Sequence, residues 1–162
     1  NIAIVIDPTT YGTSTVASSS TYRQTYAAKL TSLSGTFSVD EKISQATTAA
    51  IGKVVEWDST LSILYYQQER YADFGTNSTT GAYVAFSGAY EITGATSSAT
   101  GTPDSTADSA VTLANQNTIS FTNGYANPEL QPDSGNIIYT ENRKPISRST
   151  DQSEDIRIIV EF

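Results

Sequence analysis

The stretch FSVDEKISQATTAAIG, residues 37–52, returns in altered form as FSGAYEITGATSSATG, residues 86–101. The two segments align without a gap at a constant offset of 49 residues, and seven of the sixteen positions are identical. The identical pairs are Phe37/Phe86, Ser38/Ser87, Ile43/Ile92, Ala46/Ala95, Thr47/Thr96, Ala50/Ala99 and Gly52/Gly101. Each copy has the pattern of a strand, a turn of small residues and a return strand near the glycine. The repeat therefore predicts two similar β-hairpins, and we interpret it as an internal duplication.

The segment between the two copies has the pattern of a further hairpin. In KVVEWDSTLSILYY, residues 53–66, Val54, Glu56 and Asp58 alternate with Val55 and Trp57. Asp, Ser and Thr at positions 58–60 are typical of a short turn that leads into the next strand. Trp57 is expected on the inner face, because its neighbours on either side are charged.

The segments that flank the repeat also favour strands. Residues 1–7, NIAIVID, carry apolar side chains on both faces, which predicts a central, buried strand. Residues 21–33 fit either a helix, with apolar residues four apart, or a long strand, and their threonine content favours the strand. Short strands are expected in AVTL (110–113), NTISF (117–121) and NIIYT (136–140). The chain is thus predicted to be all-β.

The composition excludes several kinds of chemistry. The 162 residues include no cysteine and no histidine, so a disulfide framework, a thiolate metal site and histidine catalysis are all impossible. The net charge of −8 disfavours nucleic acid and anionic membranes as partners, and no apolar run is long enough to span a bilayer. No metal and no cofactor are expected. The chain also lacks methionine, so we expect it to be a fragment or a processed product.

The carboxylate pairs do not have the arrangement of an acid/base catalyst. Asp40 and Glu41 are adjacent, as are Glu154 and Asp155, and adjacent side chains on a strand point to opposite faces. Glu56 and Asp58 share a face, but their position before a turn is typical of a solvated hairpin edge. The sequence therefore predicts no catalytic residues.

The last 22 residues, ENRKPISRSTDQSEDIRIIVEF (141–162), differ from the rest of the chain. They hold four of its nine basic residues, Arg143, Lys144, Arg148 and Arg157. Arginine has a planar, fork-shaped head that suits carboxylates and carbonyls on a partner, and Pro145 favours an extended backbone before it. The basic segment is equally consistent with a docking strip and with a polar loop that balances an acidic surface. In the final IRIIVEF (156–162), helical spacing fits Ile156, Ile159 and Val160, but the β-branched content and short length favour a strand with Ile156, Ile158, Val160 and Phe162 on one face.

The tail carries a resemblance to a known family. Residues 134–162 resemble the C-terminus of the T-even-type phage baseplate wedge subunit, gene product eight. The residues that carry the resemblance are Ser134-Gly135, Ile138-Tyr139, Glu141-Asn142-Arg143, Pro145-Ile146, Asp151-Gln152, Glu154 and Phe162. YANPEL (125–130) and the opening IAIVIDP extend it. The middle of the chain departs from the T-even form and is longer, which fits the versions expected in phages of marine cyanobacteria.

The resemblance implies a fold with two parts. Residues 1–32 and 107–162 would form one discontinuous, immunoglobulin-like β-sandwich. For residues 33–106 the resemblance implies little, and their own repeat and turn patterns predict an inserted small β-barrel or hairpin-repeat module that contains both copies of the repeat.

The resemblance also implies a function. The chain would be a non-enzymatic structural component of the virion, in the baseplate of a contractile tail, assembled in the host cytoplasm. Its partners would be other wedge subunits and a second copy in a homodimer. Glu141, Asn142, Arg143, Pro145 and Arg148 are the expected interface residues. A carbohydrate-binding β-module is the alternative, since Trp57 and tyrosines on one flat face could stack on sugars.

Overall fold

The computed structural model describes residues 2–21, 23–106 and 109–142. Every regular element in these residues is a β-strand, which confirms the predicted all-β class. The strands are β1 (Ile2–Ile6), β2 (Tyr26–Ser34), β3 (Lys42–Gln45), β4 (Ala50–Asp58), β5 (Ile63–Gln67), β6 (Ile92–Gly94), β7 (Thr100–Pro103), β8 (Ala110–Thr112), β9 (Thr118–Ser120), β10 (Tyr125–Ala126) and β11 (Asn136–Glu141). The strand preferred for residues 21–33 is present as β2, and the hairpin expected after residue 53 is present as β4 and β5.

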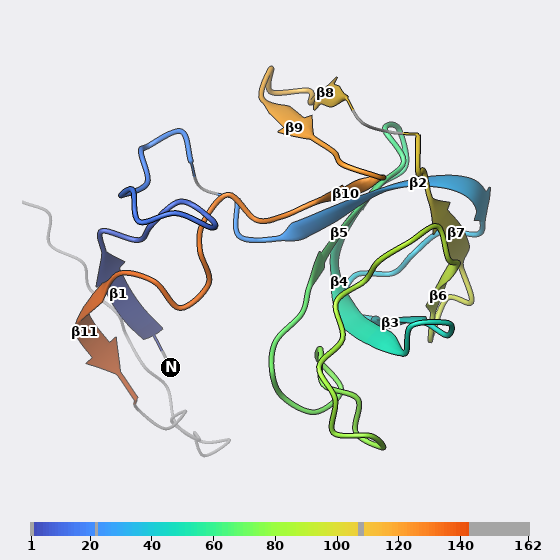
Figure 1. Cartoon of the computed structure of the whole chain (residues 1–162), viewed down its shortest axis with the longest axis horizontal. Helices are drawn as coiled ribbons and strands as arrows, with labels where there is room; N and C mark the ends of the chain where they lie inside the picture. Colours follow the sequence, from blue (N-terminus) through green and yellow to red (C-terminus); the bar gives the residue numbers. More distant parts are fainter. Residues whose placement is uncertain (1, 22, 107–108, 143–162) are drawn as a thin grey trace, which may run out of the picture.

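Six of these strands close a small antiparallel barrel (Figure 1). The order is β2-β5-β4-β3-β6-β7, and β7 pairs again with β2, so the sheet has no free edge along that circuit. Closure is possible because β2 is long and its register shifts between Thr31 and Ser34. The first half of β2 pairs with β5 and β10, and its second half pairs with β7.

The barrel has an internal two-fold pattern that follows the sequence repeat. Ser44 on β3 pairs with Thr93 on β6, the residue 49 positions later, and the two strands are antiparallel. A local two-fold axis therefore passes through this pair. Exchanging β2, β3 and β4 for β5, β6 and β7 leaves every strand neighbour around the barrel unchanged. The first and second halves of the barrel thus have the same topology.

The two turns inside the repeat are alike in detail. Ala49 and Ser98, which are 49 residues apart, both have a positive φ, of 63° and 57°. The hydroxyl of Thr48 accepts a hydrogen bond from the amide of Ala50 at 3.2 Å, and the hydroxyl of Ser97 does the same for the amide of Ala99 at 3.1 Å. The Thr/Ser exchange in the repeat therefore keeps the one group that the turn uses, a hydroxyl.

Replacing Ala49 with glycine is expected to raise the free energy of unfolding by up to about 1 kcal/mol. Alanine pays a steric cost of about 1–2 kcal/mol at a left-handed φ, and the extra freedom of glycine in the unfolded chain offsets only part of that gain. Urea denaturation measures the difference. Ala46→Gly is the matched control, since Ala46 lies in the same turn and is exposed but has no positive φ. An equal gain in both variants would show that the backbone conformation of Ala49 is not the cause.

The barrel core is built from residues of both copies. Phe37, Phe86, Ile43, Ile92 and the two alanines 50 and 99 are all buried. Each phenylalanine packs edgewise on an aromatic ring from a neighbouring strand. Phe37 meets Trp57 with 5.4 Å between ring centroids, and Phe86 meets Tyr66 at 4.9 Å. The identical positions of the repeat are thus largely the positions that fill the barrel.

Two buried polar side chains occupy the turns near the two-fold axis. The carboxylate of Glu41, whose residue is 5% exposed, accepts hydrogen bonds from the amides of Ser38, Thr96 and Ser97 and from the hydroxyl of Ser97. In the other half, the Gln45 amide oxygen accepts from the amide of Ser87 and the hydroxyl of Thr48. Ser38 and Ser87 correspond in the repeat, as do Ser97 and Thr48. A buried acceptor therefore serves two corresponding donors in both halves, but it comes from different sequence positions.

Gly94 explains this difference between the halves. It corresponds to Gln45 in the repeat, and a Cβ atom placed on it would lie 2.6 Å from Oε1 of Glu41 and 2.7 Å from Oε2. The carboxylate of Glu41 therefore occupies the space that a side chain at position 94 would need. The buried carboxylate of Glu41 therefore fits only because residue 94 is a glycine.

A second, smaller cluster lies outside the barrel wall. The strands expected in AVTL and NTISF are present as β8 and β9, which pair with each other and place Ile119 and Phe121 on Ala27, Ile63 and Ala126. The strand β10 adds to the edge of β2 through Tyr125 and Ala126. These contacts fix the segment after residue 109 against the barrel.

The strands β1 and β11 form a separate two-stranded sheet that lies apart from the barrel (Figure 1). The sequence predicted that residues 1–7 form a central, buried strand. The strand is present, but the burial prediction is wrong, because all five residues of β1 are exposed and β11 is its one partner among the described residues. A run that is apolar on both faces normally needs neighbours on both faces. The described residues provide one neighbouring strand and only part of one face.

The strand pairing crosses the domain boundaries that the sequence suggested. The barrel sheet takes β2 from a segment that begins before residue 33, and β10 from after residue 106. The sheet of β1 and β11 joins residues 2–6 to residues 136–141. The division into a discontinuous 1–32 and 107–162 domain with an inserted 33–106 module remains a prediction, as does the immunoglobulin-like arrangement.

Candidate functional site

The β1–β11 sheet has two apolar faces of different character. Antiparallel pairing sets Ile4 opposite Tyr139 and Val5 opposite Ile137, with a register shift between them because Ile138 is an extra residue on β11. Side chains alternate along β1, so Ala3 and Val5 share one face and the three isoleucines share the other. The face defined by Ile2, Ile4, Ile6 and Tyr139, called here the isoleucine face, is exposed, with Ile2 at 67%.

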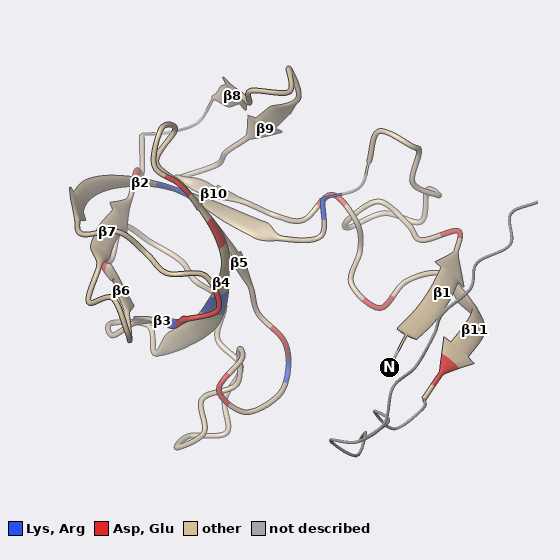
Figure 2. Ribbon diagram, turned by 180° about the vertical axis from the view of Figure 1, so that it is seen from behind, with Lys and Arg blue, Asp and Glu red and all other residues tan. Residues whose placement is uncertain are grey.

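Both outer edges of the β1–β11 sheet are open in the described part of the chain. No backbone hydrogen bond between described residues reaches the outer edge of β1 or of β11. Figure 2 shows that the sheet carries a single charge, at the end of β11, which is Glu141. Proteins usually protect free edges with charged residues, prolines or a covering segment. An edge with one charge at its end, beside an exposed apolar face, has the features of a binding surface.

The predicted interface residues begin where β11 ends. Glu141 is the last residue of β11, is half-buried, and accepts a hydrogen bond from the hydroxyl of Tyr139 at 3.1 Å. Asn142 follows and is exposed. Arg143, Pro145 and Arg148 lie outside the described residues, as does the strand predicted for 156–162. Sequence reasoning placed the interface in the basic tail but missed the isoleucine face, because it assigned residues 2–6 to a buried strand.

A cavity of about 520 Å³ lies between the β1–β11 sheet and the end of β5. Ala3 and Val5 line it on the side opposite the isoleucine face, and Gln67, Glu69 and Asp133 line it from the barrel side and the loop before β11. Burial raises the pKa of Glu69, and the negative charge of Asp133 raises it further. This face of the sheet therefore has two carboxylates across the cavity from it.

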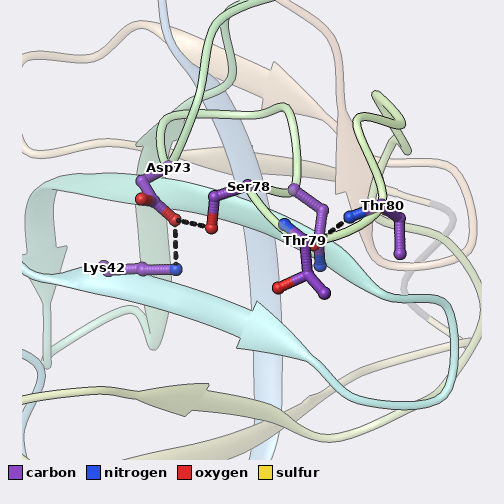
Figure 3. Close-up of polar contacts among 6 residues, drawn as sticks. Lys42, Asp73, Ser78, Thr79 and Thr80 are labelled. Carbon is purple, nitrogen blue, oxygen red and sulfur yellow. Dashed lines mark hydrogen bonds and ion pairs between the residues drawn. The ribbon is translucent and has the colours of Figure 1, made fainter.

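The long loop between β5 and β6 is held to the barrel by an exposed polar contact (Figure 3). Lys42 forms an ion pair with Asp73 at 2.6 Å, and the hydroxyl of Ser78 donates to the same carboxylate oxygen at 3.1 Å. The Asn77 side-chain oxygen accepts from the amides of Thr79 and Thr80, which closes the next turn. The polar groups of Lys42, Asp73, Ser78 and Asn77 that form these contacts hold the loop in place.

The carboxylates that the sequence suggested as candidates have structural uses where the structure describes their contacts. Asp58 uses one carboxylate oxygen to accept hydrogen bonds from the amides of Thr60 and Leu61, which caps the β4–β5 turn. Glu41 is buried and fully engaged by its donors, while Glu154 and Asp155 lie outside the described residues. Over residues 2–21, 23–106 and 109–142 no three His, Cys, Asp or Glu side chains gather as metal ligands, and no helix is long and apolar enough to cross a membrane.

Trp57 is half-buried and packs against the main core cluster. Its ring meets the Phe37 ring at an interplanar angle of 66°. A tryptophan that stacks on sugars presents a free ring face to solvent. In this chain a large part of the indole surface is used for packing.

Comparison with protein families gives a match for the C-terminal part of the chain. Residues 105–162 match the family model described as Bacteriophage T4, Gp8. No curated protein and no solved structure matches the chain significantly. The matched region includes β8, β9, β10 and β11, and it extends past the described residues to the end of the chain. The comparison therefore confirms the resemblance inferred from the tail: from residue 105 onward, this chain is similar to bacteriophage T4 Gp8.

Proposed function

We propose that this chain is a non-enzymatic structural component of the baseplate wedge in a contractile phage tail, and that it binds neighbouring wedge subunits. The observation that carries the proposal is the family match over residues 105–162. This region contains β11, which forms half of the only sheet in the described residues that exposes a large apolar face. The segment that is similar to a baseplate protein thus also contributes to an exposed apolar surface.

The isoleucine face is the contact surface in this proposal. Burying the exposed parts of Ile2, Ile4 and Ile6 on a partner would be favourable at about 25 cal/mol for each Å² of apolar surface removed from water. Protein interfaces have an apolar centre and a polar rim. Glu141 and Asn142 lie at the end of β11, beside this face, and Arg143, Pro145 and Arg148 follow them in sequence. We therefore assign the predicted interface residues to the rim.

Reversing the charge of Arg143 and Arg148 to glutamate is expected to weaken co-assembly with a wedge subunit about tenfold, the effect of losing roughly 1.4 kcal/mol of polar contacts at a rim. Co-purification and sedimentation with the other wedge proteins measure the loss, and a thermal melt of the variant shows whether the fold is intact. Arg70→Glu is the control, because Arg70 is exposed in the β5–β6 loop, and the same thermal melt shows the effect of losing its contact with the Tyr83 ring. Unchanged co-assembly of the double variant would contradict the assignment of these arginines to the interface.

Binding of carbohydrate is the alternative function. It requires aromatic rings whose faces are free to stack on a sugar. Trp57 packs against Phe37, so part of its indole surface is not free for such stacking. Location in the virion tail, assembly in the host cytoplasm and formation of a homodimer are consistent with the proposal and belong to it.

A further inference from the structure

We propose that the connection between β5 and β6 binds an acidic saccharide, with the ring of Tyr71 stacked on a sugar and with Arg70 and Lys53 paired with its anionic groups. This site lies on the barrel, and the proposed baseplate role does not require it. Three features of the connection and its surroundings support such a site. They are its length, its exposed aromatic rings and two cations that have no ion-pair partner among the described residues.

The β5–β6 connection is much longer than its counterpart in the other half of the barrel. The two-fold pattern makes it equivalent to the connection between β2 and β3, which spans residues 35–41, whereas the β5–β6 connection spans 68–91. The first half thus shows that a short segment is enough to join these strands. Figure 1 shows the longer connection, in green, extending away from β3 and β4. Connections of this length without a strand of their own usually have a function besides joining two elements.

The connection exposes an aromatic platform. The rings of Tyr71 and Phe74 are stacked, with 4.9 Å between their centroids and 20° between their planes. Tyr71 is nevertheless 57% exposed, so much of its ring remains in contact with solvent. The C–H groups on one face of a sugar ring are apolar and pack well on an exposed aromatic face. Phe74 supports the Tyr71 ring, so the platform is formed before any ligand binds.

Two cations accompany the platform. Lys53 and Arg70 each lie over an aromatic ring of the connection, 5.6 Å and 4.7 Å from the ring centroids. Lys42, which is opposite Lys53 in the β3–β4 pairing, forms an ion pair with Asp73 (Figure 3). Lys53 and Arg70 form no ion pair with a carboxylate in the described part of the chain. Their charges are therefore available to carboxylate or phosphate oxygens of a ligand.

The hydrogen bonding of the connection favours a saccharide over an extended peptide. A peptide that adds to a strand needs a row of free backbone donors. In residues 73–82 the amides at 73, 74, 76, 77, 79, 80, 81 and 82 already donate within the connection. Thr79 and Thr80 are exposed and supply further hydroxyl groups. A ligand with apolar ring faces, many hydroxyls and few charges matches these side chains.

The charge of the chain favours a saccharide over a nucleic acid. Single-stranded nucleic acids also stack on aromatic rings, but they have a phosphate on every nucleotide and bind in long basic grooves. Only two unpaired cations accompany this platform, and the chain has a net charge of −8. Acidic saccharides whose charges are widely spaced fit such a surface better.

Binding to an array of oligosaccharides tests the proposal with the full chain. The array contains oligosaccharides with uronate, sialate or phosphate groups and neutral ones of equal length. Retention of one or more acidic members is expected, with a Kd below about 1 mM in calorimetry. The neutral form of the best ligand should bind about tenfold more weakly. Raising the salt concentration from about 50 to about 500 mM should weaken binding of the acidic form severalfold, since salt screens exposed charges.

Point variants show whether the platform is the binding site. Tyr71→Ala is expected to weaken binding of the best ligand about tenfold, whereas Tyr71→Phe keeps the ring and should bind almost as well as the unchanged chain. Arg70→Gln and Lys53→Gln should each weaken binding a few-fold and reduce its salt dependence. Tyr90→Ala is the control, because Tyr90 is exposed but lies in the part of the connection that both repeats share. Thermal melts show whether each variant is folded.

Three results would overturn the proposal. The first is that no acidic oligosaccharide is retained, or that acidic and neutral forms bind equally well. The second is an unchanged affinity in folded Tyr71→Ala. The third is binding of an oligothymidylate as tightly as the best saccharide, which would assign the platform to nucleic acid. None of these results bears on co-assembly with wedge subunits, which the arginine variants of the tail test separately.

Discussion

Alanine at Ile43 or at Ile92 is expected to lower the free energy of unfolding by about 2–5 kcal/mol in each case, the usual cost of truncating a fully buried isoleucine. Both side chains are completely buried, and they lie on the two strands that flank the local two-fold axis. Since small domains are stable by only about 5–15 kcal/mol, either change removes a large share of the total. Urea denaturation followed by Trp57 fluorescence measures the loss.

The repeat predicts that the two variants lose similar amounts of unfolding free energy. Ile43 and Ile92 have the same position in their hairpins and contribute to the same core cluster. Val39→Ala is the control, since Val39 precedes β3 but is exposed, and surface changes of this kind stay within about 0.5 kcal/mol. A cost at Ile92 near that of the control would show that the second hairpin does not share the barrel core.

Replacing Glu41 with glutamine is expected to cost about 2–4 kcal/mol, although the shape of the side chain hardly changes. The carboxylate accepts hydrogen bonds from three backbone amides and one hydroxyl. An amide has one oxygen and one donor group in place of two oxygens, so at least one buried N–H would face another N–H. Thermal and urea unfolding measure the effect. Glu56→Gln, an exposed change on β4, is the matched control and should have almost no effect.

The same carboxylate predicts a dependence of stability on pH. Burial by itself would raise the pKa of Glu41, but hydrogen bonds from Ser97, Ser38 and Thr96 outweigh it and hold the pKa below its ordinary value of 4.5. A carboxyl whose pKa is lowered by folding stabilises the protein above that ordinary value, and the contribution is lost as the pH falls through the folded value. The Glu41→Gln variant should therefore lose less stability than the unchanged chain on acidification from pH 5. Parallel acid-unfolding curves would contradict this role.

The corresponding position in the other half suggests a rescue. Gln45 supplies the buried acceptor for Ser87 and Thr48, and Gly94 is its counterpart in the repeat. In a Glu41→Ala background, the carboxylate beside Gly94 is gone, and the Ser97 hydroxyl, 2.6 Å from the same Cβ position, needs only to rotate about its short side chain. Adding Gly94→Gln is expected to restore part of the lost stability, whereas Gly94→Gln alone collides with the carboxylate of Glu41. A double variant no more stable than Glu41→Ala would show that the two halves are not interchangeable at this site.

The elements of this protein follow from local sequence patterns. The repeat predicted two hairpins, and the Asp58 turn, the β8–β9 hairpin and β11 were each predicted within a few residues. Alternation and turn residues act over short stretches, so one sequence is enough to find them. The tail also carried enough family-specific residues to predict the similarity to Gp8, which the comparison confirmed over residues 105–162.

The position of those elements could not be derived in the same way. Residues 2–6 form the predicted strand, but the sequence placed it in a core, whereas the structure pairs it with β11 and leaves its isoleucines exposed. Apolar residues on both faces indicate that a strand needs covering, and they do not say whether its own chain or a partner covers it. The isoleucine face was missed as a candidate site for that reason.

The sequence by itself determined the all-β class, the paired hairpins and the family resemblance, since these depend on the periodicity and identity of neighbouring residues. Only the tertiary structure decided that six strands close into a barrel with a two-fold pattern. It also decided that Glu41 is the buried hydrogen-bond acceptor in one half, where Gln45 is the acceptor in the other. The physical reason is that closure and the sharing of a buried acceptor depend on which distant segments meet. Residues 41 and 94, or 4 and 139, become neighbours only once the chain is folded.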